Sequence, residues 1–174
     1  MLTRDRLTEQ QWVPIRNTPH HVIIAVSSAG GSPFDEMLER NAGLQAIVDA
    51  MNSTHPLLRE IAVAQQIMQA QDQIRAWYYQ QQDANRTPAK LQAKALASLD
   101  EALQILRTGG DRDDMLIYPD FVLSVAMRVA RSAKEGDLLG IGGQLVSSGE
   151  KDFIDRVARA IERARDCGLE TSAP

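Results

Sequence analysis

The chain is short of several residue types, and each shortage excludes a class of protein. Cys167 is its one cysteine among 174 residues, so no disulfide can form within the chain. Its longest purely apolar run, residues 22–26, is far below the roughly 20 residues that a membrane-spanning helix needs. The first residues, MLTRDRLTEQQ, lack the apolar core of a secretory signal. The net charge is −4, with Lys and Arg scattered among acids. We therefore expect a cytoplasmic protein with no membrane span and no nucleic-acid partner.

Catalytic motifs are also missing. There is no Gly-x-Ser-x-Gly elbow, no Gly-Lys-Ser/Thr phosphate loop and no Glu-x-x-His pair of a di-iron bundle. The three histidines, His20, His21 and His55, do not have the spacing of metal ligands and lie near expected helix starts, where neutral imidazole is favoured. Cys167 lies at the end of the last expected helix, where the helix dipole disfavours a thiolate. The sequence predicts a protein that is not an enzyme.

Helical patterning is what the sequence has in abundance. Thr18-Pro19, Ser32-Pro33 and Thr87-Pro88 each combine a helix-capping residue with proline at the first helical position, and His55-Pro56 is a near variant. Strand signals are nearly absent, and apolar residues recur at helical spacing. Two helix faces are predicted in this way: Leu57, Ile61, Ala64, Met68, Ile74 and Trp77 on one, and Leu91, Ala95, Leu99, Leu103 and Leu106 on the other. We expect one all-α domain over residues 1–174, a bundle of about seven helices. The expected helices span about 8–16, 18–29, 32–52, 55–82, 88–107, 112–135 with an interruption near Pro119, and 147–167.

Two levels of organisation are expected within this bundle. The polar connection QQQDANR joins two long helices into a central antiparallel hairpin over about 55–107. The two ends of the chain resemble each other weakly, because Pro19 with Val22 and Ile23 is matched by Pro119 with Val122 and Leu123. This match predicts two helix-loop-helix units, at about 8–52 and 112–167, related as an internal repeat.

In both units an apolar helix is followed by a glycine loop and by an acid early in the next helix. This pattern resembles the tellurite-resistance TerB-type helical domains, although Ala29 stands where that family has a loop acid. The resemblance covers about 60 residues in two pieces. It implies that loop acids bind a divalent cation, with Glu135 and Glu150 in one site and Asp35 or Glu36 in the other.

The segment 136–146 is rich in glycine and carries five aliphatic residues, which predicts a loop folded against the bundle. Its glycines lead into a helix start, where free backbone N–H groups favour an anion. Gly142, Gly143, Ser147 and Ser148 are therefore candidate anion-binding residues. The alternative is purely structural, with Ser147 and Glu150 forming a capping box.

The triplet Trp77-Tyr78-Tyr79 cannot place all three rings in one core, so at least one ring is expected at the surface. Together these features predict a non-enzymatic helical module that mediates protein–protein interaction or self-association, with residues 77–79 as its interaction surface. The alternative function is a metal- or small-anion-binding domain. It would use the acidic and glycine-rich loops. No cofactor is expected, except a divalent cation if this alternative holds in its metal-binding form.

Overall fold

A computed structural model describes residues 1–29, 33–80, 87–135 and 147–169, with the side chains of 33–34, 133–135 and 167–169 left out. In these ranges the chain forms helices and no strand, as the sequence predicts. Two short 3-10 helices, η1 and η2, span Arg4–Arg6 and Ala50–Asn52. The α-helices are α1 (Glu9–Ser27), α2 (Pro33–Asp49), α3 (Pro56–Ile61), α4 (Ala64–Gln80), α5 (Pro88–Gly109), α6 (Arg112–Glu135) and α7 (Ser148–Leu169).

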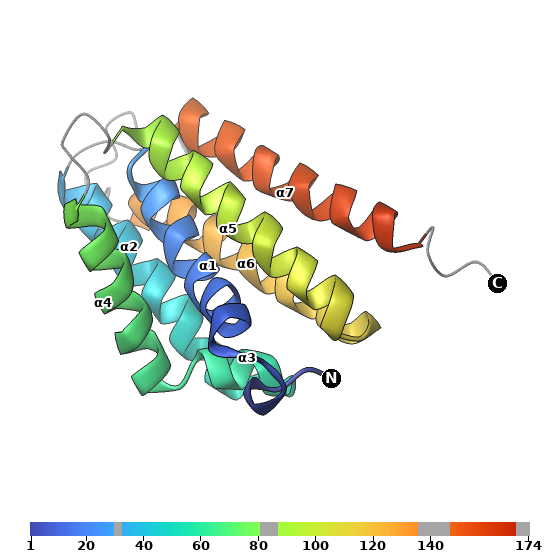
Figure 1. Cartoon of the computed structure of the whole chain (residues 1–174). Coiled ribbons are helices and arrows are strands. Elements are labelled where there is room, and N and C mark those ends of the chain that lie inside the picture. Colours follow the sequence, from blue (N-terminus) through green and yellow to red (C-terminus); the bar gives the residue numbers. More distant parts are fainter. Residues whose placement is uncertain (30–32, 81–86, 136–146, 170–174) are drawn as a thin grey trace.

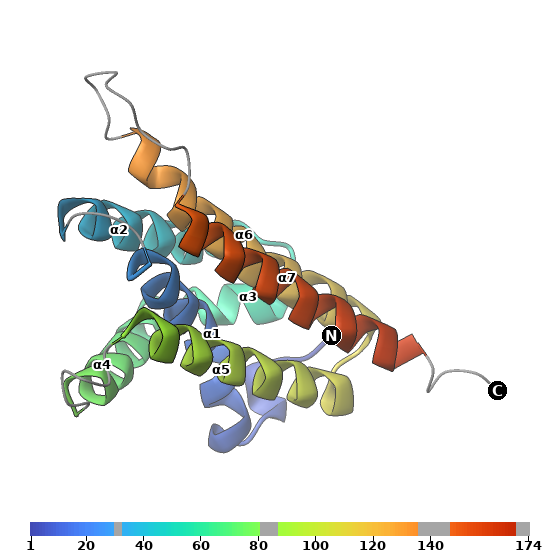
Figure 2. The same ribbon diagram turned by 90° about the horizontal axis from the view of Figure 1, so that it is seen from above.

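Helix α1 is the centre of the bundle. It packs against α2, α4, α5, α6 and α7, and Figures 1 and 2 show the other helices arranged around it. Helices α5 and α7 run side by side in the same direction, and α6 lies against both. Helices α4 and α5, expected to form the central hairpin, share no extensive interface; Lys94 of α5 lies over the ring of Trp77 of α4, 6.0 Å from its centroid.

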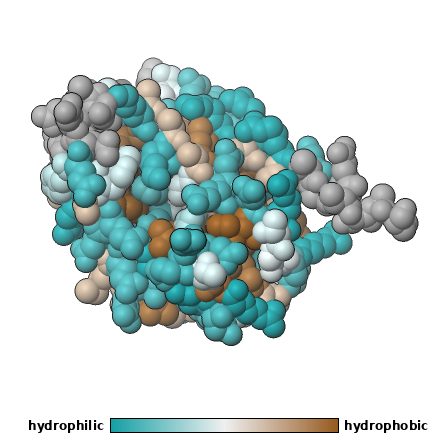
Figure 3. Space-filling model, viewed as in Figure 1, coloured by the Kyte–Doolittle hydropathy of each residue, from teal (hydrophilic) through white to brown (hydrophobic). Residues whose placement is uncertain are grey.

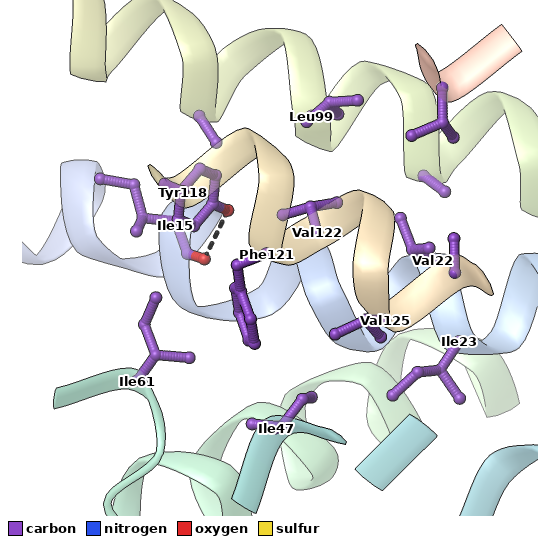
Figure 4. Close-up of a cluster of buried hydrophobic side chains, with 14 of the residues drawn as sticks. Ile15, Val22, Ile23, Ile47, Ile61, Leu99, Tyr118, Phe121, Val122 and Val125 are labelled. Carbon is purple, nitrogen blue, oxygen red and sulfur yellow. Dashed lines mark hydrogen bonds between the residues drawn. The ribbon is translucent and has the colours of Figure 1, made fainter. Parts of the chain in front are cut away.

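The core is a continuous apolar cluster contributed mainly by α1, α5, α6 and α7 (Figure 4). Gly43 lets the backbone of α2 pack directly against side chains of α1 and α6. A Cβ at this position would lie 2.5 Å from Ile23 and 2.7 Å from Val129, which is too close for a normal contact. The α5 face predicted from the sequence is confirmed, because its five members are buried: Leu91, Ala95, Leu99, Leu103 and Leu106.

Helix α1 continues through Pro14 and Pro19, whereas the sequence predicts two helices that meet at Thr18. Proline at position 19 has no N–H to donate to the carbonyl of Ile15, one helical turn earlier. The hydroxyl of Tyr118 replaces this donor at 2.8 Å, from the buried middle of α6 (Figure 4). A residue distant in sequence therefore allows the helix to pass the proline.

Two other helix boundaries differ from expectation. Helix α6 passes Pro119 without the expected interruption. The single helix expected over 55–82 is two helices, because α3 ends at Ile61 and α4 begins at Ala64. The break changes which residues face inward: Met68, expected on the same face as Leu57, is 62% exposed.

Polar contacts hold α4 against α1 after this break. The buried guanidinium of Arg16 donates to the amide oxygens of Gln66, Gln69 and Gln73 at 2.8–3.2 Å. The indole of Trp12 also donates to Gln66, at 2.8 Å. These bonds fix the glutamine-rich helix in place and explain why α4 leaves the line of α3.

Candidate functional site

A groove between α5 and α7 combines an arginine-lined rim with an apolar floor. Two adjoining hollows of about 270 and 250 Å³ form it, and they share Asp100, Ala160 and Arg163. Its floor is aliphatic: Leu96 and Leu103 from α5, Ala160 and Ala164 from α7. The two helices lie alongside each other here, so the groove follows both helix axes.

Four guanidinium groups line this groove. Arg156, Arg159 and Arg163 recur along α7 at spacings of three and four, which places them on one helix face. Arg107 joins them from the last turn of α5. All four are exposed, and none forms an ion pair with another described residue. Arg156 donates a hydrogen bond to the amide oxygen of Gln92, at 3.1 Å.

Acidic residues lie both in the groove and next to its arginines on α7. Asp100 is the one acid among the described residues that line it. By helical spacing, Asp155 and Glu162 lie one turn of α7 from Arg159, and Asp166 lies one turn from Arg163; all three acids are exposed and do not line the groove. The face that carries the groove is hydrophilic over most of its area, with small apolar patches between polar residues (Figure 3). The arrangement suits an occupant that is both acidic and apolar.

The aromatic residues 77–79, expected to form an interaction surface, face different surroundings. Trp77 is half-buried, its ring packed edge-on against His21 with centroids 5.6 Å apart. Tyr78 and Tyr79 turn toward a separate cavity beside α1 and α2 and pack edge-to-face, 5.8 Å apart. Tyr79 is 68% exposed, which confirms that at least one ring lies at the surface.

The candidate metal ligands are distributed over different environments. Glu36 pairs with Arg40 on the surface of α2, and Asp35 is half-buried one residue before it. Glu150 is buried at the start of α7, and the side chain of Glu135 lies outside the described residues. Within the part of the chain described here, no three metal-ligating side chains cluster. The cation site stays a prediction.

Glu150 instead faces Glu39, which the sequence pattern did not single out as its partner. Both carboxyl groups are buried, at 1% and 3% exposure for Glu39 and Glu150. Burial and the Glu150 carboxylate, with smaller contributions from Asp35 and Glu36, raise the pKa of Glu39 to about 8. Glu39 therefore carries its proton at neutral pH and can donate it in a hydrogen bond to Glu150.

At the start of α7, Ser147 and Glu150 form the capping box that the sequence offers as the structural alternative to an anion site. The Ser147 hydroxyl accepts from the backbone N–H of Glu150 at 3.2 Å, and the Glu150 carboxylate accepts from the backbone N–H of Ser147 at 2.7 Å. This is a capping box. Ser148 is exposed beside it. Gly142, Gly143 and the rest of the 136–146 segment lie outside the described residues, as does the Cys167 side chain.

Two histidines are placed differently from expectation. His20 and His21 lie in the middle of α1, not near a helix start, and both are buried. Burial lowers the pKa of His20 to about 4 and that of His21 to about 3, with smaller contributions from neighbouring cations. The imidazoles of His20 and His21 are therefore neutral, as expected, but the cause is their burial and not a nearby helix start.

The acidic pair at the start of α6 divides into one exposed and one buried member. Asp113 is exposed, as expected of a first helical turn, but Asp114 is fully buried. Its carboxylate accepts from the backbone N–H groups of Leu2 and Asp111 at 2.8–3.0 Å, and His55 Nε2 lies 3.2 Å from it. Asp114 therefore anchors the start of the chain to α6.

No protein-family model, curated protein or solved structure matches this chain. The resemblance to TerB-type domains and the internal repeat stay predictions. Along the described residues, no helix is both long and apolar enough to cross a membrane. The arginine groove was not predicted from the sequence, although the spacing of the α7 arginines in FIDRVARAIERAR indicates a common helix face. No sequence pattern indicates that α5 forms the opposite wall of the groove.

Proposed function

We propose that this chain is a non-enzymatic helical module that binds an acidic amphipathic helix of a protein partner in the α5–α7 groove. The observation that carries the proposal is the set of four arginines along this groove without an ion-pair partner among the described residues. In a chain of net charge −4, four arginines against one lining acid would give the groove itself a positive potential, which the neighbouring acids of α7 reduce. This potential would attract and orient an acidic partner.

The spacing of the arginines supports a helical occupant. Arg156 and Arg163 are seven residues apart, a rise of about 10 Å along α7. Carboxylates at matching spacings of three and four on a docked helix would meet the guanidinium groups in turn. The apolar side chains between them would contact the floor formed by Leu96, Leu103 and Ala160.

A protein partner fits this groove better than a nucleic acid. A phosphate backbone gains little from an aliphatic floor, because its affinity comes from charge neutralisation. Asp155, Glu162 and Asp166, exposed one turn from the α7 arginines, would also repel a polyanion that extends beyond the groove. An acidic peptide with an apolar face satisfies both parts of the groove.

A labelled synthetic peptide tests the proposal directly. Its sequence would place Glu at spacings of three and four beside a Leu stripe, and a scrambled peptide of equal composition is its control. We expect fluorescence anisotropy to give a dissociation constant of about micromolar size that weakens with added salt. The double variant Arg159→Glu with Arg163→Glu should lose about tenfold or more in affinity.

A matched variant controls for the change in net charge. Arg59→Glu with Arg112→Glu reverses two exposed arginines outside the groove and should bind the peptide as the unmodified chain does. The proposal would be refuted if the groove variant bound the peptide as tightly as the unmodified chain does, or if the unmodified chain bound the scrambled peptide as tightly as the designed one. Sedimentation of both variants also shows whether a second copy of the chain occupies the groove. If the unmodified chain is a dimer and only the groove variant is a monomer, the occupant is a second copy.

A further inference from the structure

A second cavity, separate from the arginine groove, lies where α1, α2 and α4 meet. Its volume is about 250 Å³. The apolar part of its lining comes from Ile23 and Ile24 of α1, Leu44 of α2 and Ile74 of α4. This volume is below the 300–1,000 Å³ that is usual for drug-sized ligands, so the cavity suits a small molecule.

The polar groups around this cavity favour a negative charge. Arg40 enters from α2 and Arg75 from α4, and the phenol rings of Tyr78 and Tyr79 line the same space. No carboxylate is among the described residues that line it. Arg40 donates to Glu36 and Ser27, and Arg75 lies 4.0 Å from Asp72, but each guanidinium has five N–H donors and keeps some for another acceptor.

One buried polar atom at this cavity lacks a partner. His20 lines the cavity and is 4% exposed, yet its Nε2 has no hydrogen-bond partner. Buried polar atoms in folded proteins are nearly always paired, and each exception requires an explanation such as an absent ligand or water. Nε2 itself has almost no accessible surface, so a small turn of the imidazole toward the cavity would bring its Nε2–H tautomer within reach of an acceptor placed there.

We propose that this cavity binds a small monocarboxylate with an apolar body. The carboxylate accepts hydrogen bonds from His20 Nε2, Arg75 and the remaining donors of Arg40. The hydrocarbon part lies against Ile23 and Ile74, and Tyr79 covers the mouth. A carboxylate suits this set because every polar atom named here can act as a donor, and because guanidinium groups bind carboxylates with matching geometry.

Titration with four small probes tests the assignment. Hexanoate and benzoate carry the charge, and hexanamide and benzamide are their uncharged counterparts. With isoleucine-methyl labelling, we expect hexanoate or benzoate to shift the signals of Ile23, Ile24 and Ile74 saturably below about 10 mM. The Nε2 signal of His20 should move in the same titration, since its hydrogen bond forms on binding. The amides should produce no saturable shift.

Two exposed variants keep the test independent of folding. Arg75→Gln should weaken binding of the charged probe about tenfold, because it removes one charge-assisted hydrogen-bonding partner. Arg112→Gln makes the same change on α6, away from the cavity, and should bind as the unmodified chain does. The assignment is overturned if neither carboxylate shifts these signals, if the amides bind equally well, or if Arg75→Gln binds unchanged. The charge-reversed α7 variant should bind the carboxylate normally, so this result is separable from the peptide test.

Discussion

Replacement of Glu39 by glutamine should stabilise the protein above neutral pH and leave it nearly unchanged in mild acid. Glu39 is buried between α2 and the start of α7, beside the Glu150 carboxylate. Its folded-state pKa is about 8 against an ordinary value of 4.5. Between these values the folded chain retains a proton that the unfolded chain has lost, so stability falls as the pH rises.

The size of the effect follows from the same two values. Each unit of pKa difference corresponds to about 1.4 kcal/mol, so titration to pH 7 costs roughly 3 kcal/mol. Structural relaxation reduces this figure, and we expect about 2 to 3 kcal/mol. The glutamine of Glu39→Gln still donates a hydrogen bond to Glu150 and has no proton to lose.

Urea unfolding of both proteins at a series of pH values measures the difference. We expect equal stability within about 0.5 kcal/mol near pH 5, and a variant more stable by about 2 to 3 kcal/mol near pH 8. His20 and His21 complicate the absolute curves, because the unfolded chain alone binds their protons below about pH 6.5. Both proteins therefore lose stability in acid, and the difference between them is the quantity to compare.

Glu36→Gln is the matched control, because Glu36 lies on the same helix, about one turn before Glu39. Glu36 is at the surface and pairs with Arg40, so its loss should cost less than about 0.5 kcal/mol at either pH. Parallel stability curves for the Glu39→Gln variant and the unmodified chain would refute the interpretation that Glu39 keeps its proton beside Glu150.

Three further substitutions, with Gly109→Ala as a control for one of them, test how the bundle is assembled. Tyr118→Phe leaves the carbonyl of Ile15 without a donor and should cost about 1 to 3 kcal/mol in urea unfolding; an unchanged midpoint would mean that this bond does not matter. Gly43→Ala should destabilise by about 1 to 2 kcal/mol, because its methyl group meets two core side chains, whereas Gly109→Ala has open space and should be neutral or stabilising by up to about 1 kcal/mol. Asp114→Ala should cost about 3 kcal/mol or more and increase hydrogen exchange at the backbone N–H of Leu2; slow exchange there would show that the chain start is anchored elsewhere.

The candidate site shows how far sequence reasoning reached. The exposure of at least one ring among residues 77–79 and the capping box of Ser147 with Glu150 were predictable, because both depend on residues close together in the chain. The arginine groove was not, since Arg107 and Arg163 belong to helices that meet only in the folded protein. The Glu39–Glu150 pair was missed for the same reason.

By itself, the sequence determined the helical class, the places where α2, α3 and α5 begin, and the inward face of α5. These features follow from proline at a first helical turn and from apolar spacing, which act over a few residues. Tertiary structure alone decided that α1 continues through Pro19 and that Asp114 is buried. Both need a partner from a remote part of the chain, the Tyr118 hydroxyl in one case and the backbone of Leu2 in the other. A helical pattern specifies which residues turn inward, but only packing determines which hydrogen-bonding groups they meet.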